Sequence, residues 1–258
     1  MLDGLVAGAL DDAARRRETR PLATVEAAAL AASPAIDACA ALRRAEQVKV
    51  IAEVKRASPS RGALASIPDP AVLARQYAAG GASAISVLTE ERRFGGSLAD
   101  LMAVREAVSI PVLRKDFIAD EYQVLEARAA GADLVLLIVA ALDDSTLATL
   151  HSLIIELGMT PLVETHDADE LSRAIDLGAE VIGVNARDLS TFELDRDLFG
   201  RLAPQMPDGV IRIAESAVSS VADVEHYRRA GADVVLIGEA LVTGGDPVAT
   251  LNEFLAVS

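Results

Sequence analysis

The chain has no tryptophan, a single cysteine and few aromatic residues of any kind. One cysteine, Cys39, excludes an internal disulfide and a metal site built from several thiolates, so we expect a reducing, cytoplasmic setting. No apolar stretch reaches the roughly 20 residues that a membrane span requires, and no basic-then-apolar signal pattern opens the chain. We therefore expect no membrane partner.

Basic residues are scarce relative to acidic ones: 24 Lys and Arg stand against 39 Asp and Glu, for a net charge of −15. Such a surface disfavours nucleic acid as a partner. A small anionic substrate remains compatible, because a few cations set the charge of one pocket. Hydrophobic residues make up 52% of the chain, enough for a large core. Its 258 residues fit one large α/β domain or two small ones.

Short runs rich in Val, Ile and Leu alternate with helix-length segments after residue 47. The predicted strands are 48–54, 84–89, 111–115, 133–139, 160–164, 181–185, 210–214 and 233–237. The predicted helices are 70–80, 97–108, 120–130, 143–157, 167–177, 195–203, 219–230 and 246–256. This alternation predicts βαβ units and a parallel sheet.

A repeat supports the prediction. "GGASAISVL", "GADLVLLIV", "GAEVIGVN" and "GADVVLIG" share a glycine, a small residue and a buried strand, at intervals of about fifty residues. Eight strands, each followed by a helix, predict a (β/α)₈ TIM barrel with additional N-terminal helices. We expect residues 1–258 to form a single domain, with 1–47 as a helical extension covering or flanking the barrel. An open doubly wound sheet is the alternative, but no G-x-G-x-x-G follows the first strand.

Ionisable or amide side chains end nearly every predicted strand. Side chains two residues apart share a face of a strand, which pairs Glu53 with Lys55 and Asn185 with Arg187. The other members of this set are Lys115 and Phe117, Glu164 and His166, Glu215 and Ser216, and Gly238 and Glu239. Any one of them is explained as a helix cap or a loop ion pair. The whole set predicts an active site at the carboxyl-terminal mouth of the barrel.

The loops "AESAVSS" and "IGEALV" follow the seventh and eighth strands. Backbone N–H groups in these loops often bind phosphate in this fold, although Ser216 and Ser219 also suit ordinary helix capping. We interpret His166 as a loop histidine at a helix start. No histidine and carboxylate pair has metal-ligand spacing, so we expect no metal.

Six segments resemble the signature blocks of the indole-3-glycerol-phosphate synthase family, in order and at similar spacing. They are "VIAEVKRASPSRG", "PVLRKDFI", "PLVETHD", "VIGVNARDL", "IAESAVS" and "VLIGEALV". The resemblance implies a lyase of tryptophan biosynthesis that needs no metal or organic cofactor. It would convert phosphorylated 1-(2-carboxyphenylamino)-1-deoxyribulose 5-phosphate to indole-3-glycerol phosphate, releasing CO₂ and water. We expect a monomer by default, with a weak dimer as the alternative.

The matching blocks also imply residue roles. Lys115 resembles the general acid at the substrate ketone and Glu164 an acid/base carboxylate, and which of Glu164 and Glu53 is the base stays open. The other catalytic candidates are Lys55, Asn185 and Ser216. The expected substrate contacts are Ser58, Pro59, Phe94, Phe117, Arg187, Glu215, Ala217, Gly238 and Glu239, with the two phenylalanines beside the anthranilate ring. The segment 58–62 would be a flexible cover and a ligand contact.

One position departs from the family pattern, which usually has Glu-Ser-Gly after the seventh strand. Here the third residue is Ala217, so we expect either a negative φ or a slightly altered grip on phosphate.

Three rival readings stay open. One is an aldolase-type lyase with a Schiff base on Lys115. Another is the neighbouring isomerase of the same pathway, which wants a cysteine near the end of the first strand, whereas Cys39 lies before that strand. The third is a non-catalytic phosphate-binding protein.

Overall fold

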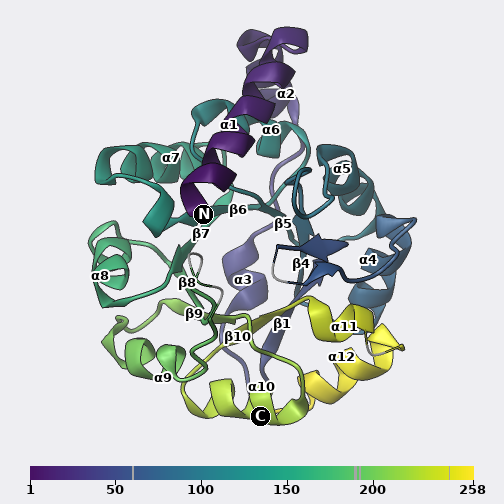
Figure 1. The fold of residues 1–258 in the computed structure, drawn as a ribbon, viewed down its shortest axis with the longest axis vertical. Helices are drawn as coiled ribbons and strands as arrows, with labels where there is room; N and C mark the ends of the chain where they lie inside the picture. The colour runs from purple at the N-terminus through teal and green to yellow at the C-terminus, as the bar shows by residue number, and fades with distance from the viewer. Residues whose placement is uncertain (60, 189–190, 192, 244) are drawn as a thin grey trace.

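The computed structural model describes the whole chain except residues 60, 189–190, 192 and 244 (Figure 1). Eight parallel strands close into a barrel in the order β1-β10-β9-β8-β7-β6-β5-β4. Their bounds are β1 (Lys49–Val54), β4 (Ala84–Leu88), β5 (Val112–Lys115), β6 (Leu134–Ile138), β7 (Thr160–Thr165), β8 (Val181–Asn185), β9 (Ile211–Glu215) and β10 (Val234–Ile237). The TIM barrel is confirmed, and the closed strand order excludes the open sheet.

Helices surround the barrel, as Figure 1 shows. They are α4 (Pro70–Ala79), α5 (Leu98–Ala107), α6 (Glu121–Ala129), α7 (Asp144–Glu156), α8 (Ala168–Asp176), α9 (Leu198–Leu202), α10 (Val221–Arg229), α11 (Glu239–Thr243) and α12 (Pro247–Leu255). Most begin at a side chain that accepts a backbone N–H of the first turn, as Asp69, Ser97 and Asp167 do. In the described part of the chain, no helix is long and apolar enough to cross a membrane.

Two predicted elements differ from the structure, and a hairpin in the first βα loop was not predicted. The helix expected at 195–203 begins only at Leu198, because Leu194 pairs with Arg187 and the N–H of Asp195 donates to the carbonyl of Ala186. The fourth strand ends at Ile138, and the 3₁₀ helix η1 (Val139–Ala141) follows it. The first βα loop contains a small hairpin, β2 (Ala57–Ser58) with β3 (Gly62–Ala63), which the sequence did not indicate. Ser60 of that loop lies outside the described residues.

The sequence repeat has a structural counterpart in two buried aspartates. The carboxylate of Asp133 accepts the N–H of Val112, and that of Asp233 accepts the N–H of Arg212, at 2.8 and 3.0 Å. Each aspartate therefore ties the start of its own strand to the start of the preceding one. The shared pattern "GAD" thus fixes the register at the amino-terminal end of the barrel.

The additional N-terminal helices are confirmed as α1 (Leu2–Thr19), α2 (Leu22–Ala31) and α3 (Ala38–Leu42). Helix α3 closes the amino-terminal end, because Ala38 and Leu42 are buried with the apolar interior of the barrel. Helix α2 packs against α6, and α1 reaches the opposite end, where Leu5 faces the cavity described below. Both ends of the barrel are therefore contacted by residues that precede its first strand.

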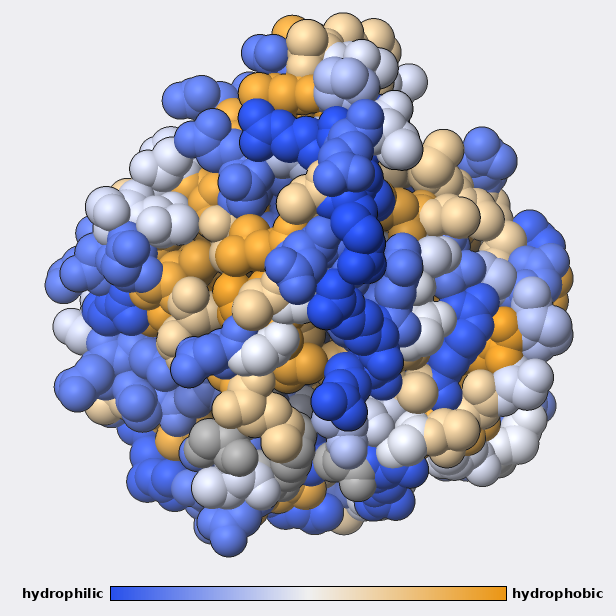
Figure 2. All heavy atoms as spheres, turned by 45° about the horizontal axis from the view of Figure 1, so that its top comes forward, coloured by the Kyte–Doolittle hydropathy of each residue, from blue (hydrophilic) through white to orange (hydrophobic). Residues whose placement is uncertain are grey.

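The surface carries both hydrophilic and hydrophobic residues, as expected for a chain with many charged and few aromatic side chains. Figure 2 shows a band of hydrophilic residues crossing one face, with hydrophobic residues grouped on either side of it. Exposed large apolar side chains are scattered over different elements; they include Leu30 on α2 and Ile155 on α7. Single exposed apolar residues of this kind are usual on a folded protein.

Candidate active site

A cavity of about 730 Å³ opens at the carboxyl-terminal ends of the strands. All the candidate residues predicted from the sequence line it: Glu53, Lys55, Ser58, Pro59, Phe94, Lys115, Phe117, Glu164, Asn185, Arg187, Glu215, Ser216, Ala217, Gly238 and Glu239. They come together because the strands are parallel, so every strand ends at the same mouth. The volume suits a small organic substrate.

Lys115 lies at the centre of the charged groups. Its Nζ is 3.1 Å from Oε2 of Glu164 and 3.5 Å from Oε2 of Glu215. Burial lowers the pKa of Lys115, but Glu164, Glu215 and Glu53 together raise it more, so the net pKa is raised. The side chain is therefore an ammonium at neutral pH.

The carboxylates beside Lys115 differ in protonation. Burial raises the pKa of Glu164, but Lys115 and His166 lower it more strongly, and the net pKa falls well below its usual range. Burial and the charge of Glu164 raise the pKa of Glu215 to about 8. Two coupled carboxyl groups thus share one proton, which resides on Glu215 at neutral pH.

A second cation–carboxylate pair lies at the end of β1, where Glu53 is in the strand and Lys55 directly follows it. Nζ of Lys55 is 2.6 Å from Oε2 of Glu53, whose other oxygen accepts a 3.4 Å hydrogen bond from Ser86. Gly238 makes room for this pair, because a Cβ there would lie 2.6 Å from Oε2 of Glu53. Gly238 was expected as a phosphate contact, and the structure adds this packing reason for a glycine.

Glu215 also depends on a glycine, Gly183 of β8. A Cβ on Gly183 would lie 2.1 Å from Oε1 of Glu215. That oxygen is buried and has no hydrogen-bond partner among the described residues. A side chain at residue 183 would therefore displace the carboxyl group of Glu215 from its position beside Lys115.

Asn185 links the two sides of the mouth. Its amide nitrogen donates to Oε1 of Glu164 at 3.2 Å. Its Oδ1 accepts the hydroxyl of Ser216 at 2.8 Å and the backbone N–H of Arg187 at 3.1 Å. The amide is thus oriented by three contacts, and Ser216 is tied to Glu164 through it.

The loop after β9 has an uncommon backbone. Ser216 and Ala217 have φ of +67° and +58°, and no other non-glycine residue in the described part of the chain has a positive φ. The negative φ offered for Ala217 is therefore wrong. The capping alternative is wrong too: Ser220 caps α10, and the hydroxyl of Ser219 donates to Asp223. The backbone strain of these two residues lies at the cavity wall, and such strain is often found at functional sites.

This backbone predicts the effect of changing Ala217. Valine is expected to lower the free energy of unfolding by about 1–2 kcal/mol, because a β-branched residue fits a left-handed conformation poorly. Glycine is expected to be at least as stable as alanine, since relief of the Cβ strain offsets its larger unfolded-state entropy. Urea unfolding followed by circular dichroism measures both. A valine variant as stable as the parent would contradict the assigned φ.

Known proteins similar to this chain agree with the chemistry of the site. A family model described as indole-3-glycerol phosphate synthase matches residues 2–254. The chain belongs to the indole-3-glycerol phosphate synthase family. It is 74% identical over 257 residues to the synthase of Leifsonia xyli subsp. xyli, with 100% of the chain and 98% of that relative covered. It is 60% identical over 247 residues to the synthase of Rhodococcus opacus, covering 96% and 91%.

The family assignment confirms the resemblance seen in the sequence and the expectation of a lyase of tryptophan biosynthesis. A solved 3-hexulose-6-phosphate synthase superposes with a TM-score of 0.63 at 24% identity, covering 82% of this chain and 100% of that one. At that identity the likeness shows the shared barrel fold alone. Within the described residues, no group of three His, Cys, Asp or Glu side chains is arranged to hold a metal.

Several residues that line the cavity of this indole-3-glycerol phosphate synthase family member were not predicted. Leu5 comes from α1, and its Ala- and Leu-rich surroundings gave no signal for a site residue. Arg196 comes from the loop before α9, whereas Arg61 belongs to the segment 58–62 that was expected to cover the site. Nη1 of Arg61 lies 2.9 Å from Oε1 of Glu239, so an ion pair joins the loop after β1 to the first residue of α11.

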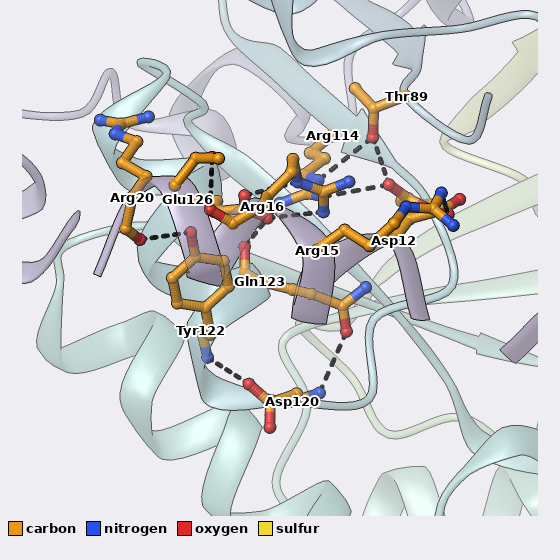
Figure 3. Close-up of polar contacts among 12 residues, drawn as sticks. Asp12, Arg15, Arg16, Arg20, Thr89, Arg114, Asp120, Tyr122, Gln123 and Glu126 are labelled. Carbon is orange, nitrogen blue, oxygen red and sulfur yellow. Dashed lines mark hydrogen bonds and ion pairs between the residues drawn. The ribbon is translucent and has the colours of Figure 1, made fainter. Parts of the chain in front are cut away.

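A buried polar network lies behind Lys115, on the outer face of β5 (Figure 3). Arg114 is fully buried there and donates to the carbonyl of Gln123 at 2.6 Å and to Asp116 at 3.1 Å. Glu126 of α6 lies 3.5 Å from Arg114 and accepts two hydrogen bonds from Arg16 of α1, at 2.6 and 2.8 Å. The N-terminal helix is thereby joined to the strand that ends in Lys115.

Proposed function

We propose that this chain catalyses ring closure of 1-(2-carboxyphenylamino)-1-deoxyribulose 5-phosphate to indole-3-glycerol phosphate, with loss of CO₂ and water. The observation that supports this most is the Lys115 ammonium between Glu164 and Glu215 in the cavity of a member of this family. We still predict that the enzyme is monomeric and cytoplasmic and that it uses no metal or organic cofactor.

Binding is proposed to use three parts of the wall. The loops after β9 and β10, with Ser216, Ala217 and Gly238, are suited to the phosphate through backbone N–H groups. Phe94 and Phe117, whose ring centroids are 6.1 Å apart, offer an apolar surface to the aromatic ring. Cationic side chains at the mouth, such as Arg187, would attract the substrate carboxylate.

In the ring-closing step, the aromatic carbon that bears the carboxylate bonds to the ketone carbon. The ketone oxygen gains negative charge as the bond forms, and an alkoxide is costly in a buried site. The Lys115 ammonium is suited to donate a proton to it. The ionised Glu164 would stabilise the positive charge that develops on the ring and nitrogen. Loss of CO₂ then restores the aromatic ring.

In the second step, the new hydroxyl group leaves as water and a neighbouring carbon loses a proton. This step needs both an acid and a base. Lys55 and Glu53 form an ion pair of 2.6 Å at the end of β1, so we assign the acid role to Lys55 and the base role to Glu53. Glu164 is the competing base, and comparison of the products released by Glu53→Gln and Glu164→Gln separates the two.

The Schiff-base rival needs a neutral amine at Lys115. The raised pKa of Lys115, set by Glu164, Glu215 and Glu53 against burial, favours the ammonium, which is an acid and not a nucleophile. Borohydride reduction in the presence of substrate tests this directly. A stable adduct on Lys115 would replace the acid–base proposal with the aldolase-type one.

The Ser216→Ala variant is expected to lose about tenfold or less in kcat. The hydroxyl that donates to Asn185 is lost, but the backbone N–H of residue 216, suited to phosphate, remains. Steady-state kinetics measures the change, with Ser145→Ala on the surface of α7 as a matched control. A loss as large as that of a removed general acid would give Ser216 a direct part in proton transfer.

The function itself is tested by following indole fluorescence after adding the carboxyphenylamino-deoxyribulose phosphate, without added metal. The chain contains no tryptophan, so the product signal arises on a low protein background. Absence of product at micromolar enzyme would refute the proposal.

A further inference from the structure

His166 occupies a position between two carboxylates at the start of α8. Its Nε2 lies 3.2 Å from Oε1 of Glu164, and its Nδ1 lies 3.0 Å from Oε2 of Glu170. The backbone N–H of His166 donates to the same Glu170 oxygen at 2.8 Å. The His166 side chain is only 11% exposed. The imidazole is therefore fixed on both sides and by its own backbone.

This geometry determines which form of the ring fits. A neutral imidazole has one N–H donor and one nitrogen lone pair, whereas an ionised carboxylate only accepts. With a carboxylate at each nitrogen, the neutral ring would direct its lone pair at an oxygen, but the imidazolium presents a proton to both. Nε2 meets Glu164 at ion-pair distance without an aligned hydrogen bond, so charge is the main part of that contact.

We propose that His166 is a positioning residue: as an imidazolium braced by Glu170, it holds Glu164 ionised and directed at Lys115. The inference rests on the proposed function for its catalytic meaning, since His166 does not line the cavity and acts through Glu164. Glu164 is then placed between two cations, Lys115 at Oε2 and His166 at Oε1. The proton shared by the two buried carboxyl groups accordingly resides on Glu215.

The charged groups around His166 support this assignment. Glu164 comes from its own strand and Glu170 from α8, while Lys115 of β5 and Glu215 of β9 act on it through Glu164. Burial lowers the pKa of His166, but Glu164 and Glu170 raise it to about 10. The imidazolium is therefore retained through neutral pH, and it is lost only as the pH rises through that value.

The charge state is tested without substrate, so its failure is distinct from failure of the proposed function. The chain has three histidines, and burial lowers the pKa of His151. Long-range ¹H–¹⁵N NMR at about pH 8.5 is expected to show one imidazolium, absent from the His166→Gln variant. If every histidine is neutral at that pH, the proposal is overturned.

The positioning role is tested by pH profiles. His166→Gln keeps an N–H donor but removes the charge, so the acidic limb of kcat is expected to move up by about 1–2 pH units, with KM little changed. Glu170→Gln leaves the ring protonated at the pH of that limb, so it should move the limb little and instead lower the pH at which the imidazolium is lost in the NMR titration. His226→Gln on α10 is the control and should leave the profile unchanged. A loss of kcat at every pH without a shift of the limb would show a merely structural role and overturn the proposal.

Discussion

Replacing Lys115 with methionine is expected to lower kcat by about 10²–10⁴-fold while the substrate still binds. Methionine keeps most of the side-chain volume but removes the ammonium that lies 3.1 Å from Glu164 and 3.5 Å from Glu215. Without it, the ketone oxygen loses the cationic proton donor assigned to it at the moment the ring closes. The proposed phosphate contacts follow β9 and β10, and the ring contacts Phe94 and Phe117 keep their own side chains, so binding persists.

The measurement combines steady-state indole fluorescence with calorimetric titration of the substrate. Lys49→Met is the matched control, because Lys49 begins β1 at the opposite end of the barrel, in register with Val234. It should retain the kcat of the parent. Loss of binding in Lys115→Met, with normal turnover of the bound fraction, would contradict the acid role.

The position of Lys115 illustrates why most site residues could be predicted from the sequence. Parallel strands end at one mouth, and alternation decides which side chains point inward, so a list of strand ends is nearly a list of cavity residues. Glu53 with Lys55, and Asn185 with Arg187, are placed in the cavity by this argument alone. It requires the strand boundaries to be right only to within a residue or two.

The same alternation explains what sequence reasoning missed. Arg114 precedes Lys115 and so faces outward, where its partners come from α6 and, through Glu126, from α1. No local pattern connects segments so far apart in the chain. His166 shares the strand face of Glu164, but its second partner Glu170 lies on the next helix, so it was interpreted as a loop residue.

The backbone conformation of the loop after β9 could not be predicted from the sequence either. Alanine at residue 217 suggested either a negative φ or a slightly altered grip on phosphate, and the structure has the left-handed value of +58° there. Contacts with neighbouring residues determine the path of the loop. The hydroxyl of Ser216 donates a hydrogen bond to Asn185, and the backbone carbonyl of Ser216 accepts one from the Tyr227 hydroxyl at 3.4 Å. Tertiary contacts therefore override the local preference of the residue.

The buried Arg114 network gives the largest expected effect on stability. Arg114→Met removes hydrogen bonds to Thr89 at 3.1 Å and Gln123 at 2.6 Å, and leaves the buried carboxylates Asp116 and Glu126 with one fewer cation. Breaking a buried pair in this way is expected to lower the free energy of unfolding by about 3–5 kcal/mol. Urea unfolding followed by far-ultraviolet circular dichroism measures it, since tryptophan fluorescence is absent.

Arg229→Met is the matched control for that loss. Arg229 is 70% exposed on α10 and pairs with Glu225 at 3.4 Å, so removing it should cost less than about 1 kcal/mol. The contrast separates burial from the mere loss of an arginine. If both variants unfold at the same urea concentration, the prediction is wrong. The ion pair with Arg16 would then be sufficient to compensate the charge of Glu126 without Arg114.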